Sequence, residues 1–185
     1  MDKEQFLQRL QHEQNEWESF LMKIPRAQRQ QRNLYGKWSV QDVVGHVAAW
    51  ERYLTGRLSA HLQGVAATPQ KLWGEFVPPV GLEDDALNEW MADQLQEHSF
   101  DEIVALQREV RTQLINTVQT MNEAALLVIG AKVRGLPYHA TEPFWQVIAS
   151  MSYSHAQEHQ AGLQQDGRPE ASEALTAELR QLLHP

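Results

Sequence analysis

The sequence predicts an all-α protein, a four-helix bundle with additional short helices. Four long segments carry apolar residues at helical spacing, whereas no alternating run of β-branched residues extends beyond a few positions. The 185 residues are 42% hydrophobic and 22% charged, which is the size and composition of one globular domain. We therefore expect a single domain over 1–185, with its helical core at about 6–165 and a terminal appendage at 166–185.

The first long helix is expected from Phe6 to Ile24, because Pro25 ends the apolar pattern. The following stretch, 26–37, contains three arginines and one lysine but no acidic residue. We interpret it as a solvated connection.

The second long helix has the clearest start. Ser39 is its expected N-cap, because Asp42 follows at the spacing of a capping box and an apolar stripe comes next. The helix should reach Leu62, with Gly64 as its stop.

The middle of the chain predicts a loop and then two helices. Residues 64–82 contain several prolines and glycines, so we expect a long loop there. A helix follows at about 83–97. Ser99 and Glu102 then form a second capping-box pattern, which opens the third long helix, ending near Met121.

The last part of the sequence predicts a short helical turn at 122–129 and a loop at 130–142. Pro143 is expected at the first position of the fourth long helix, which runs to about Gln165. A short amphipathic helix at 171–183 should end the chain.

The charge balance is acidic. Sixteen Lys and Arg against 24 Asp and Glu give a net charge of −8, so the surface should repel phosphate backbones and anionic lipids. We therefore expect no nucleic-acid partner and no membrane association. The amino terminus lacks a secretory signal, and no window approaches the roughly 18 apolar residues of a membrane span, so we expect a cytoplasmic location.

The sequence has no cysteine. This excludes a disulfide framework, zinc or iron–sulfur clusters held by thiolates, and a cysteine nucleophile. Any metal must be bound by nitrogen and oxygen atoms.

Three histidines are the strongest candidates for chemistry. His155 and His159 lie one helical turn apart on the inward face of the last helix, so their ring nitrogens can meet at one ion. His46 lies at the flank of the apolar face of the second helix. The alternative is that all three form ordinary hydrogen bonds at the edge of the core.

A shared divalent cation would resolve the cost of burying three unpaired imidazoles. Three neutral imidazoles leave coordination positions for water or substrate, as expected of a catalytic site. Nitrogen ligands suit Zn, Ni, Fe or Co and argue against Ca and Mg.

Two segments also resemble a known family. The segment 37–51, KWSVQDVVGHVAAWE, resembles the G-W-S-x-x-D-x-x-x-H-x-x-x-W-E motif of the DinB-like (YfiT-like) four-helix-bundle superfamily. The segment 153–159, YSHAQEH, is similar to its final-helix motif Y-x-H-x-x-E-H. The resemblance covers about 6–165 and implies a DinB-like bundle in which His46, His155 and His159 are metal ligands.

The resemblance implies several activities. Members include S-transferases that use bacillithiol, mycothiol or glutathione, a maleylpyruvate isomerase, and self-resistance proteins of the colibactin-protection type. We therefore expect a metal-dependent enzyme acting on a small molecule, S-transferase-like or hydrolase-like, in which the ion activates water or a low-molecular-weight thiol. Such a thiol must come from solution, because the chain has none.

Further roles are less well defined by the sequence. Glu158 and Asp42 are candidates for hydrogen-bond partners of a metal ligand or for a general base, with a helix cap as the alternative role of Asp42. His139 is a candidate acid or base. The alternative function is a non-catalytic protein that binds or sequesters a small molecule. A homodimer formed through the first helix and the tail helix at 171–183 is compatible with either function.

Overall fold

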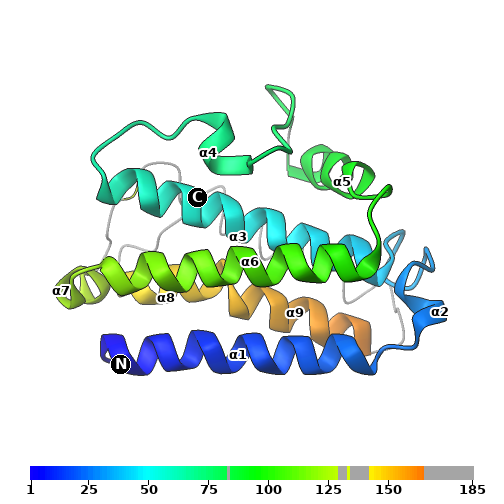
Figure 1. The fold of residues 1–185 in the computed structure, drawn as a ribbon, viewed down its shortest axis with the longest axis horizontal. Helices are drawn as coiled ribbons and strands as arrows, with labels where there is room; N and C mark the ends of the chain where they lie inside the picture. Colours follow the sequence, from blue (N-terminus) through cyan, green and yellow to red (C-terminus); the bar gives the residue numbers. More distant parts are fainter. Residues whose placement is uncertain (83, 129–132, 134–141, 165–185) are drawn as a thin grey trace.

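The protein is built from helices packed lengthwise against one another (Figure 1). The computed structural model describes residues 1–82, 84–128, 133 and 142–164, and every regular element within these ranges is a helix. The all-α prediction is confirmed, whereas the helix expected at 171–183 lies outside the described residues. The helices are α1 (Lys3–Lys23), α2 (Arg26–Arg29), α3 (Val40–Leu62), α4 (Pro69–Trp73), α5 (Asp84–Gln94), α6 (Phe100–Thr120), α7 (Glu123–Leu127), α8 (Phe144–Ser150) and α9 (Tyr153–Gln164).

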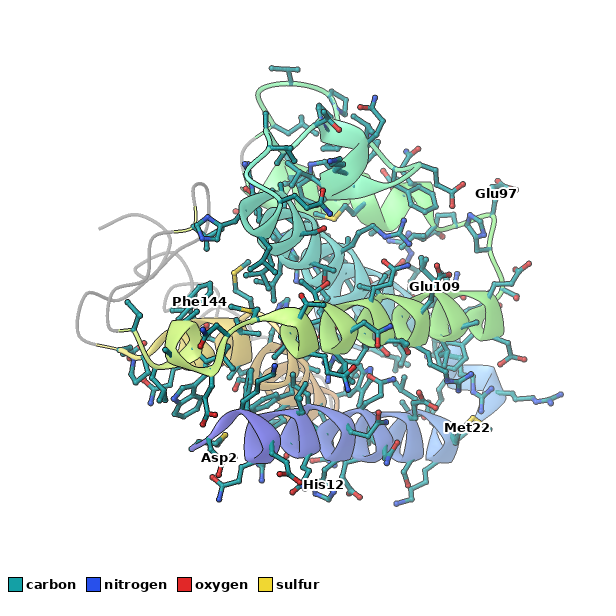
Figure 2. All side chains as sticks on the ribbon, turned by 60° about the vertical axis from the view of Figure 1, so that its left-hand side comes forward. Asp2, His12, Met22, Glu97, Glu109 and Phe144 are labelled. Atoms are coloured by element: carbon teal, nitrogen blue, oxygen red, sulfur yellow. The ribbon has the colours of Figure 1, made fainter. Side chains whose placement is uncertain are left out.

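Four rows of helix make the bundle: α1, α3, α6, and α8 followed by α9 (Figure 1). Helix α3 packs on α6, and α1 packs on both α6 and α9. Helix α9 also contacts α3, and α4 and α5 lie against α3 from outside the bundle. Side chains fill the space between these helices, whereas His12 lies on the outer face of α1 (Figure 2).

Both predicted capping boxes are present. The Ser39 hydroxyl accepts a hydrogen bond from the Asp42 amide at 3.2 Å, and the Asp42 carboxylate accepts one from the Ser39 amide at 2.8 Å. Ser99 and Glu102 make the same pair of bonds at 3.3 and 2.7 Å. These side chains satisfy amide groups that a helix start leaves unpaired, so they fix where α3 and α6 begin.

The first helix starts earlier than the apolar pattern indicates. Asp2 and Gln5 form a further capping box, so α1 begins at Lys3 instead of Phe6. It ends as expected before Pro25, because the residue before a proline is pushed into the extended region.

The last long helix is not continuous, which contradicts the prediction of one helix from Pro143 to Gln165. It is divided into α8 and α9 at Met151 and Ser152. The Ser152 hydroxyl donates hydrogen bonds to the carbonyls of Ile148 at 2.7 Å and Ala149 at 3.4 Å. Serine hydroxyls bonded to preceding carbonyls compete with helical amides and bend helices, which accounts for the break.

The stretch 64–82 also departs from its prediction as a loop, because it contains α4. Thr68 caps this short helix through a bond from the Lys71 amide at 3.3 Å. One proline of this stretch, Pro69, does not break a helix, because it occupies the first turn of α4, where proline is favoured.

The interpretation of 26–37 as a solvated connection is partly wrong. The side chain of Arg29 is only 11% exposed, and its guanidinium lies 4.8 Å from the centre of the Phe100 ring. Arg32 lies 3.5 Å from the Asp42 carboxylate. Arg29 and Arg32 therefore hold this stretch against α6 and α3.

A buried polar layer divides the apolar core into two halves. It consists of Gln14 from α1, Glu51 from α3, and Gln107 and Arg111 from α6. One half contains Phe6, Leu10, Leu54, Leu58, Leu114, Val118, Phe144 and Ile148. The other contains Trp17, Leu21, Val43, Val47, Ile103 and Ala156.

Candidate metal centre

Three histidines meet in the second half of the core. His46 lies near the start of α3, where the Ser39–Asp42 box fixes the helix. His155 and His159 lie one turn apart on α9, which packs against α3. The structure therefore brings together all three residues that the sequence proposes as metal ligands, and we call them the His cluster.

The rings of the His cluster converge through the same kind of atom. Nε2 of His155 lies 3.1 Å from Nε2 of His46 and 3.0 Å from Nε2 of His159. His46 is only 5% exposed to solvent, and His155 and His159 are each 6% exposed. One ring nitrogen from each lies within 4.8 Å of those of the other two.

Hydrogen bonding alone cannot satisfy this arrangement. A neutral imidazole carries one N–H donor and one acceptor nitrogen. Nε2 of His155 can therefore donate one proton or offer one lone pair, but it has two nitrogen neighbours. In addition, Nδ1 of His46 and Nδ1 of His159 are buried without a hydrogen-bond partner among the described residues. Such buried unpaired polar atoms are costly.

Burial keeps the three rings neutral. It lowers the pKa of His155 to about 4. The pKa values of His46 and His159 are held well below their usual range, by burial first and then by the neighbouring imidazoles. The Asn88 side chain acts in the opposite direction and raises the pKa of His46. At neutral pH the rings therefore keep the lone pairs that a metal ion needs.

Two of the three separations between the ring nitrogens fit a first-row transition metal. Metal–nitrogen distances of about 2.0–2.1 Å in a tetrahedral shell place ligand nitrogens about 3.3 Å apart. The observed separations of 3.1 and 3.0 Å are within a few tenths of an ångström of that value. The His cluster can therefore hold a metal ion.

Aromatic rings surround the His cluster. The Trp38 ring lies 5.0 Å from the His46 ring, and Trp50 lies 6.4 Å from it, measured between ring centres. Trp50 also donates a hydrogen bond of 3.0 Å to the side-chain oxygen of Asn88. These groups make the surroundings of the cluster largely apolar.

Two further predicted site residues lie in the described part of the chain, Glu158 and Asp42, and neither is part of the His cluster. Glu158 is half-buried on α9, and its charge contributes, after burial, to a raised pKa of Tyr35. His139 lies outside the described residues. Asp42 caps α3 as predicted and also accepts a hydrogen bond from Gln96 at 2.9 Å, so its contacts are those of a structural residue.

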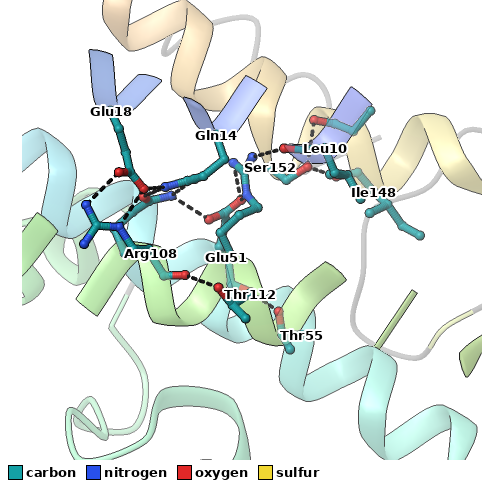
Figure 3. A network of polar contacts seen from close by, with 12 residues as sticks. Leu10, Gln14, Glu18, Glu51, Thr55, Arg108, Thr112, Ile148 and Ser152 are labelled. Atoms are coloured by element: carbon teal, nitrogen blue, oxygen red, sulfur yellow. Dashed lines mark hydrogen bonds and ion pairs between the residues drawn. The ribbon is translucent and has the colours of Figure 1, made fainter. Parts of the chain in front are cut away.

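The polar layer is the buried polar feature that the sequence reasoning missed (Figure 3). Arg111 and Glu51 form an ion pair at 2.5 Å with both side chains fully buried, and Gln107 donates to Glu51 at 3.0 Å. Gln14 exchanges hydrogen bonds with Gln107 at 3.0 and 3.2 Å. Gln14 also donates to Glu18 at 2.6 Å, which connects the layer to the outside of the bundle.

Burial also acts on the carboxyl group of the layer. It raises the pKa of Glu51, although Arg111 and Gln107 oppose the shift. The ion pair and hydrogen bonds thus offset part of the cost of burying this charge.

The chain belongs to the DinB superfamily, whose family model matches residues 9–162. That span contains the helical bundle and all three histidines of the His cluster. The predicted DinB-like resemblance and fold class are confirmed.

Similar solved structures support the fold. The colibactin self-resistance protein ClbS, solved in complex with a dsDNA, is 14% identical with a TM-score of 0.66, covering 89% of this chain and 94% of that one. The structure titled Sibling Lethal Factor Precursor, DfsB, is 14% identical with a TM-score of 0.69 and the same coverage. An uncharacterised protein from Escherichia coli UTI89 is 16% identical with a TM-score of 0.66, covering 89% and 92%. A comparison with curated proteins finds none that matches the sequence.

One expectation from the charge balance is wrong. The net charge of −8 argued against any nucleic-acid partner, but ClbS, a protein of the same fold, was solved with a dsDNA. Net charge sums over the whole surface and does not exclude a local binding face. Among the helices that the structure describes, none has the length and apolar character to cross a membrane.

Proposed function

We propose that this protein is a metal-dependent enzyme acting on a small molecule, with His46, His155 and His159 holding a divalent transition metal ion. The observation that supports the proposal is the convergence of three buried Nε2 atoms whose hydrogen-bonding needs cannot be met by one another. Nitrogen ligation suits Zn, Ni, Fe or Co.

An ion held by three imidazoles supplies Lewis acidity that lowers the pKa of a water molecule or a low-molecular-weight thiol. In an S-transferase reaction the thiol sulfur bonds to an electrophilic carbon, the leaving group departs with its electron pair, and the thiol proton passes to solvent. Because the chain has no cysteine, the thiol is a co-substrate from solution.

The chain's own residues have three tasks in this proposal. The neutral rings of the His cluster bind the ion, and the aromatic rings of Trp38 and Trp50 limit the access of water to it. Glu158 and His139 stay candidates for moving a proton. Hydrolysis is the reaction expected where water takes the place of the thiol.

A second candidate function is non-catalytic binding or sequestering of a small molecule. The structural likeness to the colibactin self-resistance protein ClbS favours it. Because ClbS was solved with a dsDNA, duplex DNA belongs among the ligands to be tried.

Product formation separates the two functions. Zinc-loaded protein is incubated with epoxides and activated esters, with and without glutathione or bacillithiol, and the products are measured by mass spectrometry. Metal-dependent turnover by the parent that is lost in His155→Ala supports the enzyme. Stoichiometric binding of a compound that is recovered unchanged with every thiol would contradict the enzyme and favour sequestering.

A further inference from the structure

A tight turn before α3 carries two aromatic rings to the His cluster. The Tyr35 amide donates to the Trp38 carbonyl at 3.1 Å, and the Trp38 amide donates to the Tyr35 carbonyl at 2.9 Å. Gly36 within the turn has a φ of +58°, in the left-handed region that glycine adopts at no steric cost. The turn therefore fixes the direction of both rings.

The two rings contact histidines from different helices. Trp38 packs against His46 of α3, whereas the Tyr35 ring meets His159 of α9 edge to face, 5.6 Å between ring centres. Tyr35 is only 8% exposed, although it lies in a connection between helices. Its ring is thus packed as firmly as a core residue.

Gly162 makes room for the Tyr35 ring. It lies on α9 three residues after His159, so both face the same side of the helix. A Cβ atom at this position would lie 2.2 Å from Cε2 of Tyr35 and 3.0 Å from both Cζ and the hydroxyl oxygen. The absence of a side chain at Gly162 is therefore what allows Tyr35 to reach His159.

We infer that Tyr35 is a positioning residue for the proposed metal site. Its ring holds the His159 imidazole at the orientation in which Nε2 faces Nε2 of His155, and Gly162 is the complementary part of this contact. The inference rests on the proposed function, because the orientation of His159 matters only if its nitrogen binds an ion. Tyr35 acts on the metal site only by orienting His159, and it does so with its aromatic ring and not with its hydroxyl group.

The test measures the Zn2+ affinity of protein without a polyhistidine tag, by competition with a chromogenic chelator. Tyr35→Ala and Gly162→Ala should each weaken binding about tenfold, as losses of groups that orient metal ligands do. Tyr35→Phe keeps the ring and should stay within about twofold of the parent. The double variant should bind no worse than Tyr35→Ala, because both changes remove one contact.

The absorption spectrum of bound Co2+ adds a readout of ligand geometry. It should change in Tyr35→Ala and Gly162→Ala and be retained in Tyr35→Phe. Tyr53→Ala is the matched control, because it removes a half-buried tyrosine whose ring packs on Trp50 and Trp73. Its Zn2+ affinity should equal that of the parent.

The variants keep the inference falsifiable. If Tyr35→Ala fails to fold, Gly162→Ala still tests it, because alanine favours a helix over glycine. Parent-like Zn2+ affinity in Gly162→Ala, or effects of the two changes that add in the double variant, would overturn the role of Tyr35 and leave the metal site intact. A parent protein that binds no metal would overturn the proposed function and this inference together.

Discussion

Two buried polar clusters lie in one helical bundle and differ in how their atoms are paired. In the polar layer, the Glu51 carboxylate accepts from Arg111 at 2.5 Å and from Gln107 at 3.0 Å, so acceptors face donors. In the His cluster, three identical ring atoms face one another. Both clusters are almost completely buried.

The difference indicates what each cluster does. Complementary partners compensate a buried charge, so the polar layer is a part of the fold that needs no ligand. Identical atoms that converge without compensation raise the free energy of the folded chain unless a ligand completes them. Buried groups with strongly shifted pKa values gather at functional sites, and the three rings of the His cluster are such groups.

The largest effect on stability is expected from breaking the polar layer. Glu51→Ala leaves the Arg111 guanidinium buried without its partner, so the free energy of unfolding should fall by about 3–5 kcal/mol. Urea unfolding of the metal-free protein measures this loss. The control Glu109→Gln, on an exposed part of α6, should change stability by less than about 0.5 kcal/mol. A loss below about 1 kcal/mol in Glu51→Ala would show that the layer is not an integral part of the fold.

The His cluster should respond to metal instead. Zn2+ at one hundred times its dissociation constant should stabilise the parent by about 2.7 kcal/mol. His155→Ala should lose this stabilisation, while His12→Ala, on the outer face of α1, should retain it. Thermal unfolding with and without Zn2+ measures the stabilisation of each of the three proteins. Equal stabilisation of the parent and His155→Ala would show that the ion binds elsewhere.

The metal-free protein should also be sensitive to acid through the His cluster. The folded-state pKa values of its rings are lowered, to about 4 for His155, so the unfolded chain binds more protons below the ordinary value of 6.5. Stability is therefore unaffected above that pH and decreases as the pH falls from 6.5 toward 4, by about 1 kcal/mol per pH unit for each ring. Unfolding measured at several pH values should show a shallower decline in His155→Ala. Parallel profiles for the parent and the variant would contradict the buried neutral state of this ring.

The smallest effect is expected at the surface. Lys37 pairs with Glu89, and both side chains are more than half exposed, so Lys37→Ala should cost less than about 1 kcal/mol and leave metal content unchanged. Arg29→Ala should cost more, because that side chain is largely buried against Phe100. Urea unfolding and elemental analysis of both variants check this order. A larger stability loss for Lys37→Ala than for Arg29→Ala would show that the exposed fraction of a side chain does not determine the size of the loss.

Local rules explain why much of the site was predictable. The spacing of His155 and His159 places two rings on one face of a helix, and the Ser39–Asp42 box sets the register of α3 that turns His46 inward. Each of these facts depends on residues within a few positions of one another. The family resemblance then related the two segments.

The polar layer depends on pairs far apart in sequence, which local patterns do not relate. Gln14 and Gln107 are 93 positions apart. A trace of the layer was nonetheless present, because Gln14 continues the inward stripe of Leu10 and Trp17. A polar residue at a core position predicts a buried partner without identifying it.

The break between α8 and α9 was missed for another reason. Ser152 bonds to the carbonyls of its own helix, and this competition does not alter the apolar spacing. Tyr35 lies in the predicted connection 26–37, where no periodicity indicates which side chains turn inward.

Elemental analysis tests the central claim most directly. The protein is purified without a polyhistidine tag, and its metal content is compared with that of His46→Ala and His155→Ala. The account predicts close to one equivalent of a divalent transition metal in the parent and its loss in both variants, with His12→Ala unchanged. Retention of the metal in both variants, or a parent that stays metal-free after incubation with Zn2+, Ni2+, Fe2+ and Co2+, would contradict it.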